Sequence, residues 1–244
     1  MKNLERWTIT HHLGDQAIER AFYVSGDSAA DRGVFAQIFT HQDYLLNRYP
    51  LTPKLTEYAQ RKSANGLKPW VLDAGANIGA SAVYFATTFP DAHIVGIEPD
   101  AENAAIARQN VTDLDVSIVE AALGSEAKTV RLQRSGLTEW AYRVGEGGDV
   151  EVPMHSAAQM CEPAQFAPYF PFIAKIDIEG GEADLFAGNN DCFYTFPLTI
   201  IELHDWMLPG QGSSQNFLRA VVNGNFDFVY AGENVFCFNL NLLC

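Results

Sequence analysis

Downstream of residue 70, short apolar runs alternate with segments in which apolar residues recur at the spacing of a helix. The runs predicted to be buried strands are 70–73, 93–98, 116–119, 172–178 and 198–204. Helices are predicted at 79–89, 101–110, 182–187 and 217–222. Alternation of strands and helices at this spacing is typical of βαβ units, so we expect an α/β fold with a parallel sheet covered by helices on both faces.

Two regions depart from this alternation. The last two apolar segments, 226–230 and 235–240, are joined only by Ala-Gly-Glu-Asn, which predicts an antiparallel hairpin rather than another helical crossover. Residues 128–133 and 150–154 alternate between apolar and polar positions, as half-exposed strands do. We interpret them as strands of a flap-like insertion near residues 124–156.

The first 69 residues follow a different pattern. Apolar positions within 31–62 predict helices that are interrupted at Pro50 and Pro53, because proline breaks a helix. The segment AIERAFYV at 17–24 fits a strand. We therefore expect a partly helical N-terminal extension or cap at 1–69, followed by the α/β domain at 70–244.

The composition indicates a folded globular protein and disfavours nucleic-acid-binding and membrane-spanning proteins. Apolar residues make up 48% and charged residues 19% of the 244 residues, which is enough apolar material for a large core. The net charge of −14 disfavours a nucleic-acid partner, because phosphate-binding proteins generally need a basic face. No apolar run reaches the ~18 residues of a membrane helix, so we expect no membrane span.

The N-terminal sequence and the cysteines predict a cytoplasmic protein with reduced thiols. The start, MKNLERWTIT, lacks the apolar core of a signal peptide. The cysteines at 161, 192, 237 and 244 are far apart and form no Cys-x-x-Cys pair, so we expect neither a disulfide framework nor a zinc knuckle.

A glycine-containing loop follows the first strand, in VLDAGANIGASAVYF at 71–85. Gly75 and Gly79 allow a tight turn, and the helix that follows offers free backbone N–H donors. The spacing is not the Gly-x-Gly-x-x-Gly of dinucleotide-binding proteins. It is typical of methyltransferases that use S-adenosyl-L-methionine (SAM), whose ammonium group needs acceptors such as the carboxylate of Asp73.

Further candidate cofactor residues end the next two strands. Glu98 follows Gly75 by 23 residues, where an acid can accept hydrogen bonds from both ribose hydroxyls; with the glycine loop upstream, we favour this role over a cap of the next helix. Glu120 and Ala121 end the third strand and are predicted near the adenine, with an exposed Glu120 as the alternative.

Four motifs together resemble the FkbM-type SAM-dependent methyltransferases: VLDAGANIG, IEPD, IAKIDIEGGEADLF and TIIELH. The resemblance covers roughly residues 70–205. It implies a Rossmann-like class I methyltransferase with a mostly parallel seven-stranded sheet and an antiparallel C-terminal strand. It also implies methylation of a hydroxyl of a sugar, a glycolipid or a polyketide-type secondary metabolite. The residues that would bind the cofactor are Asp73, Gly75, Asn77, Gly79 and Glu98.

Asp177, Glu202 and His204 are predicted at the carboxyl ends of neighbouring strands, where open parallel sheets bind ligands. An alcohol attacks poorly unless a base removes its proton, and we expect His204 to be that base with Asp177 orienting the acceptor. Alternatively, Asp177, Glu202 and His204 would hold Mg²⁺ or Mn²⁺ and stabilise the alkoxide.

Other assignments stay open at this point. Glu182 and Asp184 are interpreted as helix-start residues, since acids favour the positive end of a helix dipole, and Glu179 is an uncertain neighbour of Asp177. An NAD-dependent oxidoreductase and a non-catalytic methyltransferase-like binding module are competing functions. Residues 31–62 would either cover the cofactor site or form the interface of a homodimer.

Overall fold

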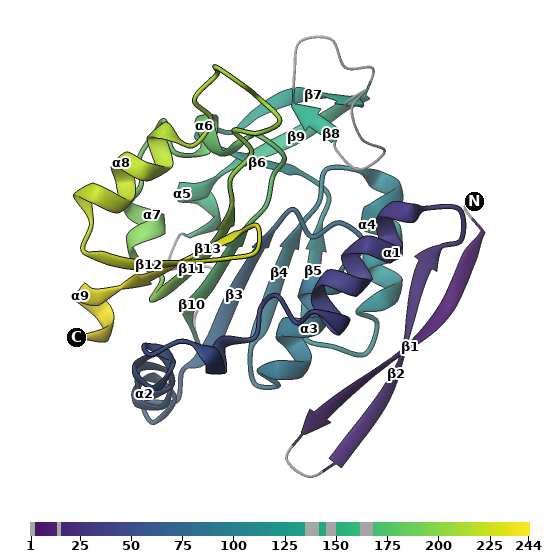
Figure 1. Ribbon diagram of the computed structural model, residues 1–244, viewed down its shortest axis with the longest axis horizontal. Helices are drawn as coiled ribbons and strands as arrows, with labels where there is room; N and C mark the ends of the chain where they lie inside the picture. The colour runs from purple at the N-terminus through teal and green to yellow at the C-terminus, as the bar shows by residue number, and fades with distance from the viewer. Residues whose placement is uncertain (1–2, 14–15, 135–141, 145–149, 162–167) are drawn as a thin grey trace.

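The computed structural model describes residues 3–13, 16–134, 142–144, 150–161 and 168–244. A seven-stranded sheet forms its centre (Figure 1). In spatial order its strands are β12 (Phe226–Ala231), β13 (Asn234–Asn239), β11 (Leu198–Glu202), β10 (Tyr169–Ile176), β3 (Lys68–Ala74), β4 (His93–Ile97) and β5 (Val116–Val119).

The sheet is mostly parallel, as predicted. β10 pairs in parallel with β3 and β11, and β4 pairs in parallel with β3 and β5. β13 runs antiparallel to both of its neighbours, β11 and β12. The predicted Rossmann-like α/β fold with an antiparallel C-terminal strand is therefore confirmed.

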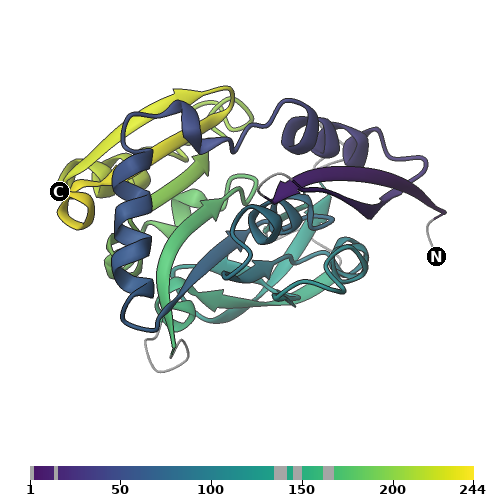
Figure 2. The ribbon, with the colours of Figure 1, turned by 90° about the horizontal axis from the view of Figure 1, so that it is seen from below.

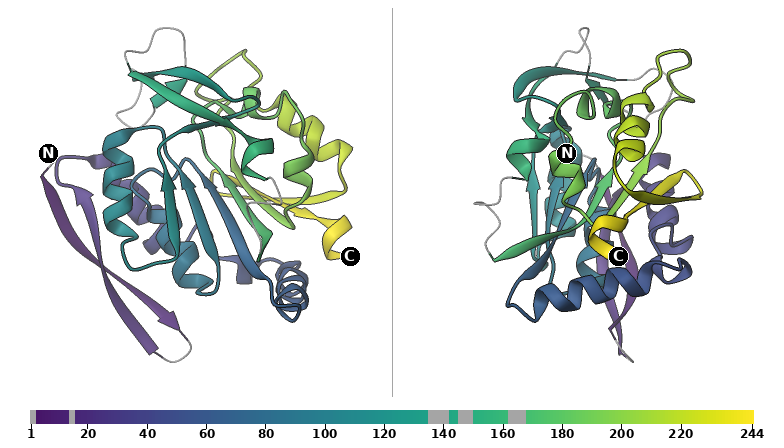
Figure 3. Two further views of the ribbon diagram at one scale, coloured as in Figure 1. Left: turned by 180° about the vertical axis from the view of Figure 1, so that it is seen from behind. Right: turned by 90° about the vertical axis from the view of Figure 1, so that its left-hand side faces the viewer.

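Helices cover both faces of the sheet (Figure 3). On one face, α3 (Ala80–Thr88) and α4 (Ala101–Asn110) pack on Val71 and its neighbours. On the other face, α6 (Glu182–Leu185), α7 (Asp191–Tyr194) and α8 (Gln215–Asn223) pack on Leu72 and its neighbours. Successive residues of β3 thus face opposite sides, which explains why the buried strands are apolar throughout.

The N-terminal segment packs on the face that α3 and α4 cover (Figure 2). It consists of a hairpin of β1 (Leu4–Leu13) and β2 (Gln16–Ser25), then α1 (Ala29–Phe35), the π-helix η1 (Ala36–Thr40), the 3-10 helix η2 (Leu46–Arg48) and α2 (Thr52–Ser63). The buried Asn110 side chain bonds both backbone groups of Tyr23 in β2, at 2.7 and 2.9 Å, and the carbonyl of Ile78, at 2.9 Å. One amide therefore ties the N-terminal hairpin to the loop before α3.

A four-stranded sheet stands over the carboxyl ends of the central strands (Figure 1). Its order is β6 (Ala122–Gly124), β9 (Val150–Ser156), β7 (Lys128–Arg134) and β8 (Tyr142–Val144). β7 and β9, the two strands predicted for the flap-like insertion, pair antiparallel. Two short helices complete the described elements, α5 (Ala157–Met160) and α9 (Leu240–Leu243). None of the described helices has the length and apolarity needed to cross a lipid bilayer.

The expectation of four reduced thiols is wrong for one pair. Cys161, at the end of α5, and Cys192, in α7, form a disulfide, and their Cα atoms lie 5.5 Å apart. The two cysteines are separated by 31 positions, so spacing along the chain gave no sign that α5 and α7 are neighbours. Cys237 and Cys244 are free.

The disulfide can be tested by titrating thiols in the protein after unfolding without a reducing agent. We expect Cys237 and Cys244 to be titrated, and all 4 cysteines only after reduction. Cys161→Ser should lower the free energy of unfolding by about 3–4 kcal/mol, because the loop that the bridge closes is freed in the unfolded chain. A reducing agent should then have no further effect on this variant. Four reactive thiols before reduction would contradict the assignment.

Candidate functional site

The carboxyl ends of β3, β4 and β10 surround a cavity of about 480 Å³. The loop after β3, the turn after β10 and the four-stranded sheet form its walls. Its lining residues include Gly75, Asn77, Glu98, Ala121, Lys128, Met154, Asp177, Glu179 and Asp184. The cavity therefore joins candidate cofactor residues to candidate catalytic residues at the edge of the sheet where the sequence predicted a ligand.

Three alternate residues of the loop after β3 adopt the left-handed backbone conformation. Gly75 has φ +80°, Asn77 +50° and Gly79 +85°. Asparagine tolerates this region because its side chain bonds locally, and Asn77 Oδ1 accepts from Ile78 N at 2.7 Å. A Cβ at Gly75 would lie 1.7 Å from the carbonyl oxygen of Asp177, so the loop packs directly on the end of β10.

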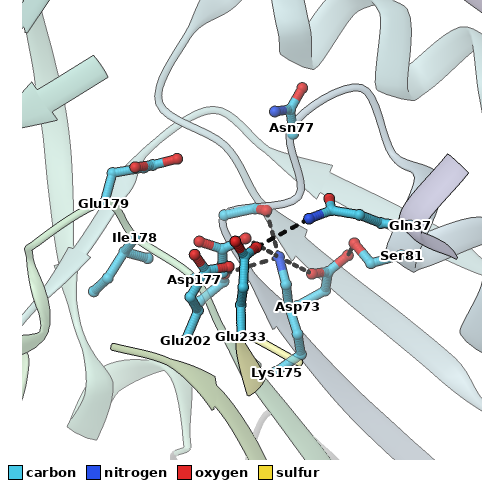
Figure 4. A network of polar contacts seen from close by, with 12 residues as sticks. Gln37, Asp73, Asn77, Ser81, Lys175, Asp177, Ile178, Glu179, Glu202 and Glu233 are labelled. Carbon is cyan, nitrogen blue, oxygen red and sulfur yellow. Dashed lines mark hydrogen bonds and ion pairs between the residues drawn. The ribbon is translucent and has the colours of Figure 1, made fainter. Parts of the chain in front are cut away.

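Buried charges hold this loop in place (Figure 4). Lys175 Nζ donates to Gly75 O at 2.6 Å and lies 3.2 Å from Asp73 Oδ1. Ser81 Oγ donates to the second oxygen of Asp73 at 2.6 Å. Burial alone would lower the pKa of Lys175, but the charge of Asp73 raises it above its usual value, so the amine stays charged. Asp73 is fully buried and supports the loop from behind; it does not line the cavity.

Glu98 fastens the same loop from the side of β4. Its two carboxyl oxygens accept from Asn77 N at 2.8 Å and from Asp100 N at 2.9 Å. Burial raises the pKa of Glu98 to about 7, although the two backbone hydrogen bonds oppose that rise. Glu98 is thus a cavity-wall carboxyl that loses its proton close to neutral pH.

Of the remaining predicted cofactor residues, Ala121 lines the cavity, whereas Glu120 and Gly79 do not. Ala121 is fully buried and lines the cavity. The Glu120 side chain is 43% exposed, pairs with Arg108 at 3.3 Å and is not part of the cavity wall. Gly79 caps α3 and lies against α4, where an added Cβ would come within 3.1 Å of Ala107.

His204 is the centre of a group of four carboxylates. Its Nε2 atom lies 3.6 Å from Asp177 Oδ1, 3.6 Å from Glu179 Oε2 and 3.5 Å from Glu202 Oε1. Its Nδ1 atom is 2.9 Å from Glu182 Oε1. The His204 side chain is buried behind Asp177 and Glu179, which do line the cavity. The structure thus brings all three predicted residues, Asp177, Glu202 and His204, together.

This crowding shifts the pKa of several groups. Burial, followed by the charge of Asp177, raises the pKa of Glu179 to about 7 and that of Glu202 to about 8. For His204, burial alone would lower the pKa, but the hydrogen bond and charge of Glu182 and the charge of Asp177 raise it to about 9. The cluster therefore exchanges protons at pH values near neutrality and above.

Glu182 is the residue of this cluster for which the sequence predicted only a place at the start of a helix. It does begin α6, as predicted, but it is fully buried and bonded to His204. A signal was available, because Leu185 and Phe186 follow Glu182 at helical spacing and are themselves buried. Asp184 points elsewhere: it accepts from Ser125 N at 3.0 Å and pairs with Lys128 at 3.2 Å, which links α6 to the four-stranded sheet.

A second cavity, of about 40 Å³, lies on the other side of the loop after β3. Residues of the N-terminal segment line it together with the cluster: Gln37, Asp43, Tyr44, Gly75, Asn77, Lys175, Asp177, Glu202 and Asn234. Gln37 Nε2 also donates to Glu233 in the turn between β12 and β13, at 3.1 Å (Figure 4). The segment before the central sheet thus contributes side chains next to Asp177.

Comparison with known proteins identifies the family of the chain. The family model described as the methyltransferase FkbM domain matches residues 73–230. No curated protein matches the chain.

Solved structures resemble the fold only distantly. An O-methyltransferase from Bacillus cereus in complex with S-adenosylhomocysteine is 12% identical, with 84% of this chain and 97% of that chain covered and a TM-score of 0.43. Precorrin-6y C5,15-methyltransferase from Geobacter metallireducens GS-15 is 12% identical, with 74% and 84% covered and a TM-score of 0.37. Scores this low carry no argument about substrate or mechanism. The family model, in contrast, spans more than half of the chain, from the end of β3 into β12, and the chain therefore belongs to the FkbM methyltransferase family.

Proposed function

We propose that this enzyme transfers a methyl group from SAM to a hydroxyl of a small molecule, of the sugar, glycolipid or polyketide-type secondary metabolite class. One observation carries the proposal: the Gly75 loop packs on the backbone of Asp177, so a cofactor loop and the acids in front of His204 share one cavity. Membership of a methyltransferase family argues against the alternatives of an NAD-dependent oxidoreductase and a non-catalytic binding module.

The residues of the cavity suit SAM. Gly75 leaves its backbone open to a ligand, Glu98 offers carboxylate oxygens to ribose hydroxyls, and Ala121 leaves space for a flat base. Asp177 and Glu179 supply negative charge where the methionine end carries positive charge. When bound, SAM supplies a methyl group on a positively charged sulfur, and its transfer to an alcohol releases S-adenosylhomocysteine and one proton.

Glu98 should make SAM binding depend on pH. Its pKa of about 7 means that the carboxylate, which holds Asn77 N and accepts from a ribose, is present above that pH and is lost as pH falls through it. We expect the Kd for SAM to rise about tenfold between about pH 8 and pH 6. In Glu98→Gln, binding should be weaker at every pH and its dependence on pH should be small. An equally steep dependence in this variant would assign the titration to another group.

The proton released by the acceptor has a path within the cluster. Asp177, at the cavity wall, would accept a hydrogen bond from the acceptor hydroxyl and so hold its oxygen toward the methyl group. His204 Nε2, 3.6 Å from Asp177 Oδ1, would take up the proton as the new carbon–oxygen bond forms, in the fraction of molecules whose imidazole is neutral; that fraction grows as pH rises toward the His204 pKa of about 9. The imidazolium so formed is stabilised by the carboxylates around it.

A metal-assisted version is the second candidate. One ligand atom from each of Asp177, Glu179 and His204 lies within 4.8 Å of the others, so Glu179 joins Asp177 and His204 as a possible ligand beside the predicted Glu202. Carboxylates with one imidazole suit Mn²⁺ or Mg²⁺, which would orient the hydroxyl and lower its pKa. Turnover that is lost in EDTA and restored by Mn²⁺ would support this version, and turnover insensitive to EDTA would remove it.

The proposed function is tested first by calorimetry with SAM, and then by screening SAM consumption against sugar, glycolipid and polyketide alcohols. Binding in the micromolar range with methylation of an oxygen in the product is the expected result. Absence of SAM binding at high micromolar concentration would overturn the proposal. Methylation of a nitrogen in the product would keep the methyltransferase and refute the acceptor class.

A further inference from the structure

Glu182 is buried, and burying a carboxylate has a high desolvation cost unless the group is well paired. It is fully buried, and its Oε2 atom makes no hydrogen bond to the described residues. Its other oxygen, Oε1, accepts from Ile178 N at 3.4 Å and contacts His204 Nδ1 at 2.9 Å. An acid that only begins a helix needs none of this burial, because it can interact with the helix dipole from the surface. The short contact with His204 is therefore the interaction that distinguishes this position.

The contact fixes both the rotation and the tautomer of the imidazole. An ionised carboxylate can only accept, so a hydrogen bond from His204 to ionised Glu182 requires the hydrogen on Nδ1. Nε2 then points toward Asp177, Glu179 and Glu202, from which it is 3.5–3.6 Å away. These distances are longer than charge-assisted hydrogen bonds of about 2.7–2.9 Å, so the three acids do not fix the ring by themselves.

We propose that Glu182 is a positioning residue that holds the His204 imidazole with Nδ1–H toward itself and Nε2 toward the cavity carboxylates, an inference that rests on the proposed function of His204. The arrangement serves either version of that function. A base needs a free Nε2 aimed at the proton it receives, and a metal ligand needs the same atom held by a bond at the opposite ring nitrogen. Glu182 touches neither cavity and acts only through His204.

A purely structural role for Glu182 would give a different pattern of effects. In that case its hydrogen bond with Ile178 N would matter most, and its loss would loosen the turn after β10 and lower stability. The state of the imidazole would stay the same. The two roles are therefore separated by a measurement on His204 rather than by activity alone.

The test uses the full chain labelled with ¹⁵N-histidine. The ring signals of the 6 histidines are recorded, and those of His204 are identified by their absence in His204→Asn. At a pH high enough for the imidazole to be neutral, we expect wild-type His204 to carry its single ring proton on Nδ1. In Glu182→Ala that signature should be lost, and Glu182→Gln should keep it, because the amide oxygen can still accept from Nδ1–H. The exposed Glu57→Gln variant, whose side chain is 62% exposed, controls for the loss of one charge.

Turnover with the acceptor found by screening gives the second readout. For Glu182→Ala, kcat should fall about 100-fold while the Kd for SAM stays within about threefold of wild type. Glu182→Gln should recover most of the loss, and it also serves if the alanine variant does not fold. An unchanged His204 tautomer in Glu182→Ala, or an unchanged kcat, would overturn the proposal. The tautomer measurement needs neither SAM nor acceptor, so its result is independent of whether the proposed function itself fails.

Discussion

Replacing His204 by Asn is expected to reduce turnover by about 10²- to 10⁴-fold while leaving SAM binding nearly intact, because it removes Nε2 and little else. The asparagine side chain can still place an N–H donor where Nδ1 lies, 2.9 Å from Glu182 Oε1. No buried acid is then left without its partner, a loss that would destabilise His204→Ala by several kcal/mol. What disappears is the atom that faces Asp177, Glu179 and Glu202.

The measurement is kcat with the acceptor identified by screening, together with the Kd for SAM from calorimetry. His93→Ala is the matched control, since His93 is paired with Asp115 at 2.7 Å and begins β4 at the opposite end of the strand from Glu98. Its turnover should match that of wild type. Turnover of His204→Asn within about tenfold of wild type would show that His204 is neither the base nor an essential ligand, and would leave Asp177 as the candidate.

The fold could be predicted largely because its signals are local. Each parallel strand of the central sheet is an apolar run that ends near a glycine, an acid or a proline, and both faces of β3 pack against helices. The N-terminal hairpin was harder to predict. β1 reads LERWTITHHL, where charged and apolar residues mix, and only partners brought by the rest of the fold bury Ile9. The tertiary context, not the pattern, makes this segment a strand.

The sequence predicted which edge of the sheet holds the site, but it did not predict which side chains point into the cavity. Topology placed Glu120 and Ala121 together, but neighbouring residues point to opposite sides, so Ala121 enters the cavity wall while Glu120 reaches Arg108. The turn after β10 shows the same limit. Glu179 adopts φ +54°, so the backbone is not extended at this residue, and its carboxylate lies 3.6 Å from His204 Nε2. Such left-handed turns cannot be inferred from apolar periodicity.

Gly75→Ala is expected to abolish measurable SAM binding, a loss of at least about 100-fold, through a single added carbon. Two costs combine at this position. The backbone has φ +80°, which for a residue with a Cβ costs about 1–2 kcal/mol, and the new Cβ would lie 1.7 Å from the carbonyl oxygen of Asp177. No rotamer can relieve that contact, because both atoms belong to the backbone framework. Either the loop or the end of β10 must move, and Lys175, which bonds Gly75 O at 2.6 Å, ties the two together.

Gly66 separates the cost of the positive φ from the cost of the steric clash, because its backbone conformation is nearly that of Gly75 but no atom lies where its Cβ would be. Its φ is +79°, and a Cβ there would meet no atom within 4 Å. Gly66→Ala should therefore lower the free energy of unfolding by about 1–2 kcal/mol and leave the Kd for SAM unchanged, whereas Gly75→Ala should lose both stability and binding. Calorimetry with SAM and thermal unfolding of the two variants provide the comparison. If Gly75→Ala bound SAM as tightly as Gly66→Ala, the close packing of the loop on Asp177 could not be what shapes the cofactor site.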